Sequence, residues 1–137
     1  MHGEPRPFRP WLCEVQELHT IINQEVFDGC LALPKFQLLR KCDIGLDFGW
    51  CEGEHSHDTK LNNPTKSLCT IGLMNHWPSM QWCIIILAHE MVHQWQWDVY
   101  SYERFLQKKR PIMSHGPSFL NFKPKLAQFG ISLKRTY

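Results

Sequence analysis

The pattern of apolar and polar positions predicts two long helices separated by short strands. The first helix is expected between residues 11 and 26, where apolar side chains recur three or four positions apart and so share one helical face. Asp28 and Gly29 are expected to end it, because both residue types favour turns. The members of the apolar face are Val15, Leu18, Ile21 and Ile22.

Three short segments favour β-strands, namely residues 35–40, 46–51 and 67–74. Pro34 stands at the start of the first, where a missing N–H group is tolerated. Thr70 and Ile71 give the third the β-branched side chains typical of strands. Residues 52–66 are polar and contain an Asn-Asn-Pro sequence, so we expect a loop there.

The second long helix contains the most apolar part of the chain. Ser79 is expected as its N-cap, and the helix is expected to end near Tyr100 or to continue toward Lys109. Residues 117–129 are expected to form a last helix that Gly130 ends, and residues 131–133 a short strand.

These elements predict an α+β domain, in which a small and mostly antiparallel sheet packs with an N-terminal helix, a long central helix and a C-terminal helix. The domain is expected to span residues 11–137, and residues 1–10, with three prolines, to form a flexible Pro-rich arm. A chain of 137 residues is long enough to bury a sizeable core.

The most informative motif is H-E-x-x-H at residues 89–93, inside the apolar central helix. His89 and His93 are four positions apart, so both imidazoles lie on one helical face and can bind one metal ion. Glu90 projects beside that face, where its carboxylate can act as a general base. The simpler reading is two structural histidines and a surface glutamate. The apolar surroundings argue against it, because an unpaired buried glutamate is costly.

A catalytic zinc ion needs a third protein ligand and one open position. Gln96 and Val99 stand where the extended H-E-x-x-H-x-x-G-x-x-H motif has Gly and His, so this ligand must come from elsewhere. His115 is favoured, because it precedes a Gly-Pro turn that can hold it rigidly at the start of a helix. Glu103 is the alternative, for a site of two histidines and one carboxylate.

The H-E-x-x-H motif followed at a distance by His115-Gly116-Pro117-Ser118-Phe119 resembles the SprT-like metallopeptidases, the family that includes Spartan. Residues 18–29 resemble the first helix of that family, and residues 49–51 and 69–73 resemble the two strands before its active-site helix. The resemblance runs from about residue 14 to near residue 137.

The resemblance implies a zincin-like minimal metallopeptidase fold with one Zn²⁺ ion. It implies His89, His93 and His115 as the zinc ligands and Glu90 as the catalytic residue. It also implies proteolysis, which in Spartan-like members is directed at proteins attached to DNA. Many members carry a C-terminal zinc ribbon with paired C-x-x-C motifs. This sequence contains no C-x-x-C, so we expect a compact form without that ribbon.

Charge is divided unevenly along the chain. Residues 1–103 contain seven Lys or Arg against thirteen Asp or Glu, whereas residues 104–137 contain eight Lys or Arg and no acidic residue. This asymmetry favours attraction to a polyanion such as nucleic acid, although the same residues could simply keep a surface soluble. The candidate nucleic-acid contacts are Lys108, Lys109, Arg110, Lys123 and Lys125.

We therefore expect a protein or peptide substrate, with DNA, single-stranded or crosslinked to protein, as a further partner. We also expect a monomer without a membrane segment, because no apolar stretch is long enough to span a bilayer. The six scattered cysteines are expected to be reduced thiols in the cytoplasm, or in the nucleus or nucleoid if the chain acts on DNA. Secretion with up to three disulfides is the alternative.

Glu54, His55, His57 and Asp58 form a second group of metal-binding residue types. Their surroundings are typical of a loop, so we favour a polar hairpin tip over a second, looser metal site.

Two other function classes stay open for the whole chain. One is a nucleic-acid-binding module in which zinc is structural, and the other is an interaction protein that holds a partner without cleaving it. Glu90 argues against the first, because a closed structural site needs no base.

Overall fold

The first predicted helix is confirmed as α1, Leu12–Val26, in a computed structural model that describes residues 6–44 and 47–137. The Glu14 carboxylate accepts a hydrogen bond from the backbone N–H of Trp11 at 2.9 Å, which satisfies a donor at the start of the helix. Asp28 and Gly29 follow the helix with φ of 54° and 73°, the left-handed conformation that reverses the chain direction.

A three-stranded sheet is formed by β1, Lys35–Leu39, β2, Gly49–Gly53, and β3, Cys69–Met74. The order is β1-β3-β2, with β1 parallel and β2 antiparallel to β3. The expectation of a mostly antiparallel sheet is therefore wrong, because the sheet is mixed. All six residues of β3 are buried, and the strand is central, paired with β1 on one edge and with β2 on the other.

The connections between the strands differ in detail from the prediction. β2 begins at Gly49, three residues later than expected, and Leu46 lies outside the described residues. Two short helices were not predicted, α2, Lys41–Ile44, and α3, Thr59–Asn62. Each is a single turn within a polar connection, too short to produce a helical period in the sequence.

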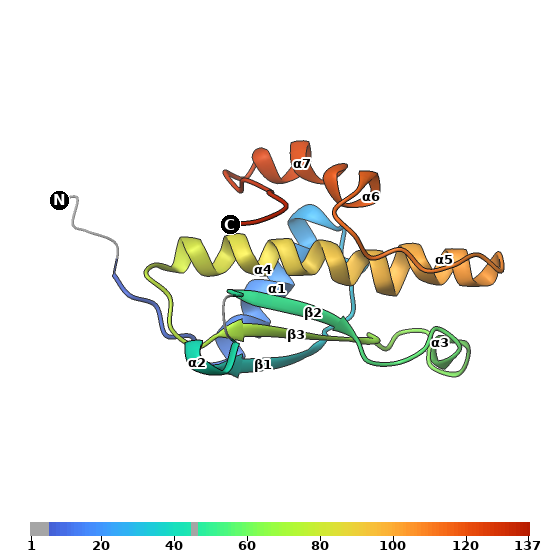
Figure 1. Cartoon of the computed structure of the whole chain (residues 1–137), viewed down its shortest axis with the longest axis horizontal. Coiled ribbons are helices and arrows are strands. Elements are labelled where there is room, and N and C mark those ends of the chain that lie inside the picture. The colour runs from blue at the N-terminus through green and yellow to red at the C-terminus, as the bar shows by residue number, and fades with distance from the viewer. Residues whose placement is uncertain (1–5, 45–46) are drawn as a thin grey trace.

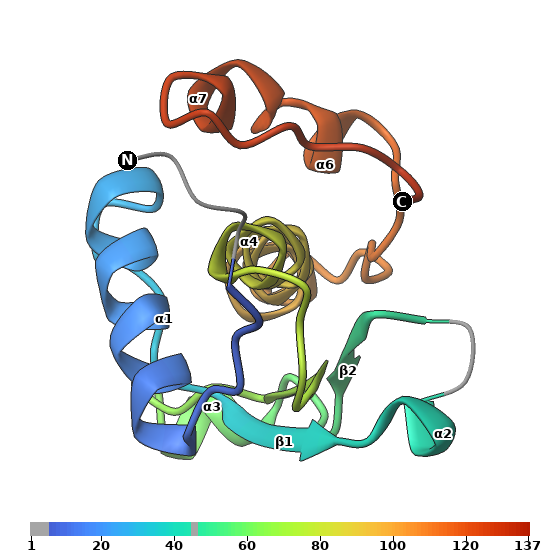
Figure 2. The ribbon, with the colours of Figure 1, turned by 90° about the vertical axis from the view of Figure 1, so that its left-hand side faces the viewer.

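The central helix, α4, spans Met80–Trp95, and its N-cap is Ser79 as predicted, with Oγ accepting from the Trp82 N–H at 3.3 Å. The helical path continues through a π-helical segment, η1, Gln96–Tyr100, into α5, Ser101–Leu106. Figure 2 shows α4 between the sheet and α6 and α7, with α1 beside it. Every residue from 86 to 92 is consequently buried. No helix of the described residues has the length and apolar character needed to cross a membrane.

The last helix is shorter than predicted and broken in two, α6, Pro117–Leu120, and α7, Lys123–Ala127. Pro124 explains the break, because its ring would clash with the carbonyl of Leu120 in a continuous helix. Residues 131–133 do not form the predicted strand. Ile131 and Leu133 are buried in the core, but the sheet lies on the opposite side of α4, so no strand is available to pair with them (Figure 1).

The described part of the Pro-rich arm is attached to the domain. Phe8 and Trp77 form an antiparallel bridge, in which each backbone N–H donates to the other carbonyl at 2.8 Å. Trp77 is fully buried, so its backbone groups need such a partner. Residues 1–5 lie outside the described residues.

A buried carboxylate joins the end of the central helix to the sheet. Asp98 accepts hydrogen bonds from Ser67 Oγ at 2.6 Å, from the Leu68 N–H at 2.8 Å and from Gln94 Nε2 at 3.2 Å. Gln94 also contacts His19 of α1 at 2.8 Å. This network fixes α4 against α1 and against the chain that enters β3.

We predict that Asp98→Ala lowers the free energy of unfolding by about 3 kcal/mol, because it leaves several buried donors without an acceptor. Urea denaturation measures the change. Glu103→Ala, at an exposed position of α5, is the control and should change stability by less than about 0.5 kcal/mol. Equal losses in the two variants would contradict the structural role of Asp98.

Candidate metal centre

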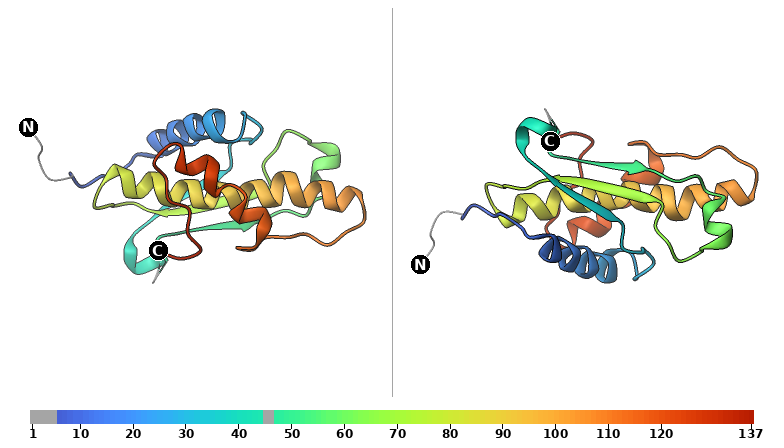
Figure 3. Two further views of the ribbon diagram at one scale, coloured as in Figure 1. Left: turned by 90° about the horizontal axis from the view of Figure 1, so that it is seen from above. Right: turned by 90° about the horizontal axis from the view of Figure 1, so that it is seen from below.

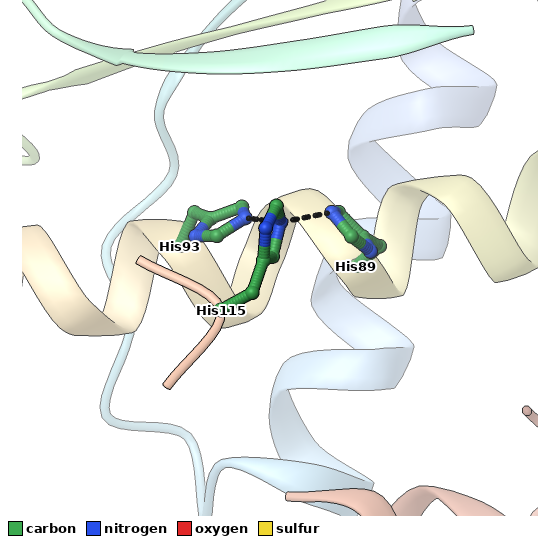
Figure 4. Close-up of side chains that lie close together, drawn as sticks. All are labelled: His89, His93 and His115. Carbon is green, nitrogen blue, oxygen red and sulfur yellow. Dashed lines mark hydrogen bonds between the residues drawn. The ribbon is translucent and has the colours of Figure 1, made fainter. Parts of the chain in front are cut away.

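Three histidines converge at the middle of the domain. His89 and His93 come from successive turns of α4, and His115 comes from the connector that precedes α6 (Figure 4). The Nε2 atom of His115 lies 3.1 Å from Nε2 of His93 and 3.4 Å from Nε2 of His89. Ligand atoms of all three residues lie within 4.8 Å of one another, close enough to bind a single metal ion.

The two short separations match those of a tetrahedral metal site. With zinc–nitrogen bonds of about 2.0–2.1 Å, the ligand nitrogens of a tetrahedral site lie about 3.3–3.4 Å apart. Without a metal, Nε2 of His115 carries either one proton or one lone pair, so it cannot form two good hydrogen bonds, to His89 and to His93, at the same time. A cation between the rings would instead satisfy three nitrogen lone pairs at once, so the donor set fits a metal ion.

The histidines are in the protonation state that a metal requires. Burial is the main cause that lowers the pKa of His89 to about 4, and the neighbouring His93 and His115 add to the decrease. Burial also lowers the pKa of His93, and a hydrogen bond with Gln96 opposes that decrease. The pKa of His115 falls through burial and through the charge of Arg135. All three rings are therefore neutral at neutral pH and can donate a lone pair.

The ring of Phe119 packs against all three imidazoles. Its centroid lies 4.9 Å from that of His89, 4.9 Å from that of His93 and 4.8 Å from that of His115. Phe119 is fully buried in α6, and Pro117 at the start of this helix fixes the backbone that leads to it. The predicted Gly-Pro turn thus directs His115 toward His89 and His93 on α4.

Gln96 is a member of the site that sequence reasoning missed. Its Oε1 contacts His93 Nδ1 at 2.8 Å, and its Nε2 donates to the Ser114 carbonyl at 2.9 Å and to Ser118 Oγ at 2.8 Å. A signal exists in the sequence, because Gln96 lies three positions after His93 and so shares its helical face. In the sequence alone, Gln96 indicates only that the extended H-E-x-x-H-x-x-G-x-x-H motif is absent.

Glu90 lies beside the histidines and is buried. Burial raises the pKa of Glu90 to about 8, and the charge of Asp47 adds to the increase. A buried carboxylate is stabilised when a positive charge lies nearby, so a cation held by the histidines would oppose this shift. Glu90 thus lines the same pocket as the three histidines, and its role as a base stays a prediction.

A cleft of about 540 Å³ opens onto the three histidines and Glu90. One wall is the edge strand β2 with the residues before it, and another is the chain from residue 113 to 115 together with the C-terminal residues 135–137. The ring of Tyr137 lies 5.5 Å from that of His89, and its hydroxyl donates to the Ser132 carbonyl at 2.7 Å. No sequence pattern marks Tyr137 as part of the site.

The other candidate ligands lie apart from this centre. Glu103 is exposed in α5, so the structure places His115 and not Glu103 with the two motif histidines. His57 is buried, and its Nε2 contacts the Trp97 carbonyl at 2.9 Å, whereas His55 is exposed. Within residues 6–44 and 47–137, His89, His93 and His115 form the one group that is arranged to hold a metal ion.

The predicted nucleic-acid contacts fall into two groups outside the cleft. Lys108, Lys109 and Arg110 are exposed beyond the end of α5, whereas Lys123 and Lys125 belong to α7. Figure 1 shows the end of α5 well separated from α7, so the two groups belong to different parts of the domain.

In comparisons with known proteins, no family model and no curated protein matched the chain. The resemblance to SprT-like metallopeptidases therefore rests on the sequence segments named above, and it stays a prediction.

We predict that His115→Ala weakens zinc binding by more than about a hundredfold. Loss of a residue that merely orients a ligand already costs about ten- to hundredfold, and this variant removes a ligand. Competition with a chromogenic chelator measures the dissociation constant. His55→Ala, at an exposed position, is the control and should bind zinc like the parent. Parent-like binding by His115→Ala would exclude His115 as a ligand.

Proposed function

We propose that the chain is a zinc-dependent metallopeptidase that hydrolyses peptide bonds in proteins. The observation that carries this proposal is the convergence of three imidazole Nε2 atoms beside a buried glutamate, in a cleft open to a substrate. Three histidines leave one coordination position free, which distinguishes a catalytic from a closed structural zinc site.

His89, His93 and His115 would hold the ion, and their neutral rings suit zinc better than they suit magnesium or calcium, which prefer oxygen ligands. When bound, zinc supplies Lewis-acid chemistry, which polarises an amide carbonyl and lowers the pKa of water. Cysteine thiolates also bind zinc, but no cysteine joins the three histidines in the group that could hold a metal ion.

Glu90 would act as general base and then as general acid. Its carboxylate would take a proton from the attacking water and deliver it to the amine that leaves the cleaved peptide bond. The pKa of Glu90 suits both steps. Burial raises it, and a divalent cation beside it would lower it again.

The cleft favours a polymeric substrate over a small molecule. It is open along β2, which pairs only with β3 among the described strands and so leaves one edge free. An extended segment of a protein could follow that edge past Glu90, with its backbone groups facing those of the strand.

We predict that Glu90→Gln keeps the zinc content of the parent and lowers the rate of peptide hydrolysis by at least about a hundredfold, because the amide cannot accept the proton. Zinc analysis and casein cleavage, each with and without EDTA and single-stranded DNA, provide the measurements. Glu52→Gln, at an exposed position of β2, is the matched control and should cleave like the parent.

The same assay separates the alternatives. Hydrolysis that requires zinc and Glu90 supports a peptidase, and stimulation by DNA supports a Spartan-like action on DNA-bound proteins. DNA binding without any cleavage would favour a nucleic-acid-binding module with structural zinc. Neither cleavage nor DNA binding would favour an interaction protein.

DNA is the second partner in this proposal, and the charge distribution supports it. No acidic residue follows Glu103 in the sequence, and four of the five candidate contacts are exposed: Lys108, Lys109, Arg110 and Lys123. A phosphate that pairs with such a residue releases its counterions, so binding should weaken steeply with salt.

We predict that Lys108→Glu combined with Lys109→Glu weakens binding to single-stranded DNA. The slope of log affinity against log salt should fall in magnitude by about 0.7 for each phosphate of single-stranded DNA that the variant can no longer bind. Fluorescence anisotropy at several salt concentrations measures both quantities. Lys66→Glu, an exposed change outside the basic segment, is the control. Identical slopes for all three proteins would place the DNA-binding surface elsewhere or exclude it.

A further inference from the structure

Gln96 connects two metal ligands that come from different parts of the chain. It is fully buried and is the first residue of η1, where the α-helix of the H-E-x-x-H motif becomes π-helical. One end of its side chain contacts His93, and the other contacts Ser114, the neighbour of His115 in sequence. Such a π-helical turn is frequent at functional sites, because it redirects side chains within a helix.

The contacts fix the orientation of the Gln96 amide. The Ser114 carbonyl can only accept a hydrogen bond, so the group that faces it at 2.9 Å must be the NH₂ of Gln96. The amide oxygen therefore faces His93 Nδ1 at 2.8 Å. An oxygen acceptor at this distance requires a proton on Nδ1, and a neutral imidazole carries only one proton.

The orientation of the amide determines which nitrogen of His93 is free. With its proton on Nδ1, His93 presents the lone pair of Nε2, the atom that lies 3.1 Å from His115 Nε2. The same glutamine holds the His115 side of the site, through the Ser114 carbonyl and through Ser118 Oγ in the first turn of α6.

We infer that Gln96 is a positioning residue, which sets the tautomer of His93 and clamps the connector that carries His115, so that the metal site is formed before the ion binds. This inference rests on the proposed metal centre. His89 shows the contrast, because its buried Nδ1 has no hydrogen-bond partner among the described residues. Packing against Phe119 and Tyr137 orients that ring instead.

Gln94 offers a matched control two residues earlier on the same helical path. It is equally buried, and its side chain contacts His19, the Ala32 carbonyl and Asp98. These contacts resemble those of Gln96 in kind and burial, but none of them touches a metal ligand. Replacing either glutamine by methionine removes a buried amide while nearly conserving side-chain volume.

The experiment compares Gln96→Met, Gln96→Glu and Gln94→Met with the parent. In the metal-free proteins, imidazole ¹⁵N chemical shifts report the tautomer of His93, and thermal unfolding reports stability. Chelator competition then gives the dissociation constant for Zn²⁺ alone. We expect the Nδ1–H tautomer of His93 in the parent, in Gln94→Met and in Gln96→Glu, which keeps the acceptor. We expect a mixture of tautomers in Gln96→Met, with zinc binding weakened about ten- to hundredfold.

Gln94→Met should lose stability and yet bind zinc within about threefold of the parent, since only a residue that orients a ligand changes metal affinity strongly. The inference is overturned if Gln96→Met keeps both the tautomer and the zinc affinity of the parent, or if Gln94→Met weakens zinc binding equally. If Gln96→Met does not fold, Gln96→Glu decides, because an Nε2–H tautomer of His93 in that variant would also overturn the inference.

A parent that binds no zinc would overturn the proposed function together with this inference. A parent that binds zinc without cleaving peptides contradicts only the peptidase.

Discussion

The three-histidine site depends on α4 being covered on two opposite sides. The sheet covers one side of this helix, and the segment that contains α6, α7 and the C-terminal residues covers another (Figure 3). A helix alone supplies two imidazoles one turn apart, His89 and His93. The third imidazole, that of His115, lies next to this pair because the ring of Phe119 in α6 packs against all three imidazoles. The packing of the core therefore also determines the positions of the three imidazoles.

The same burial has an energetic cost that a cation would offset. His89 and Glu90 are both buried, and burial shifts their pKa values in opposite directions, to about 4 and about 8. In each case the pKa shifts because burial disfavours the charged form of the side chain. A divalent ion at the convergence of the lone pairs would bind neutral imidazoles and stabilise a neighbouring carboxylate, so it suits both shifts. In the metal-free domain, burial thus disfavours the charged forms of two residues of the H-E-x-x-H motif, His89 and Glu90.

What could be predicted from the sequence depended on local signals. The periodicity of α1, the Ser79 N-cap and the i, i+4 pair of histidines each lie within one element, and the structure confirms them. His115 was identified from a rigid turn, and it lies within reach of the pair, whereas the identity of the metal stays a prediction. The mixed sheet, the partners of Gln96 and the placement of Tyr137 depend on contacts between distant segments, which no window of sequence contains.

We propose that the Nε2 atoms of three histidines bind one zinc ion and leave one coordination position free. X-ray absorption at the zinc edge of the zinc-loaded chain tests this most directly, because it identifies the ligand atoms. We expect three imidazole nitrogens and one further oxygen or nitrogen at about 2.0–2.1 Å from the ion, with no sulfur. Sulfur neighbours at about 2.3 Å, from any of the free cysteines, or fewer than three imidazoles around the ion, would contradict it.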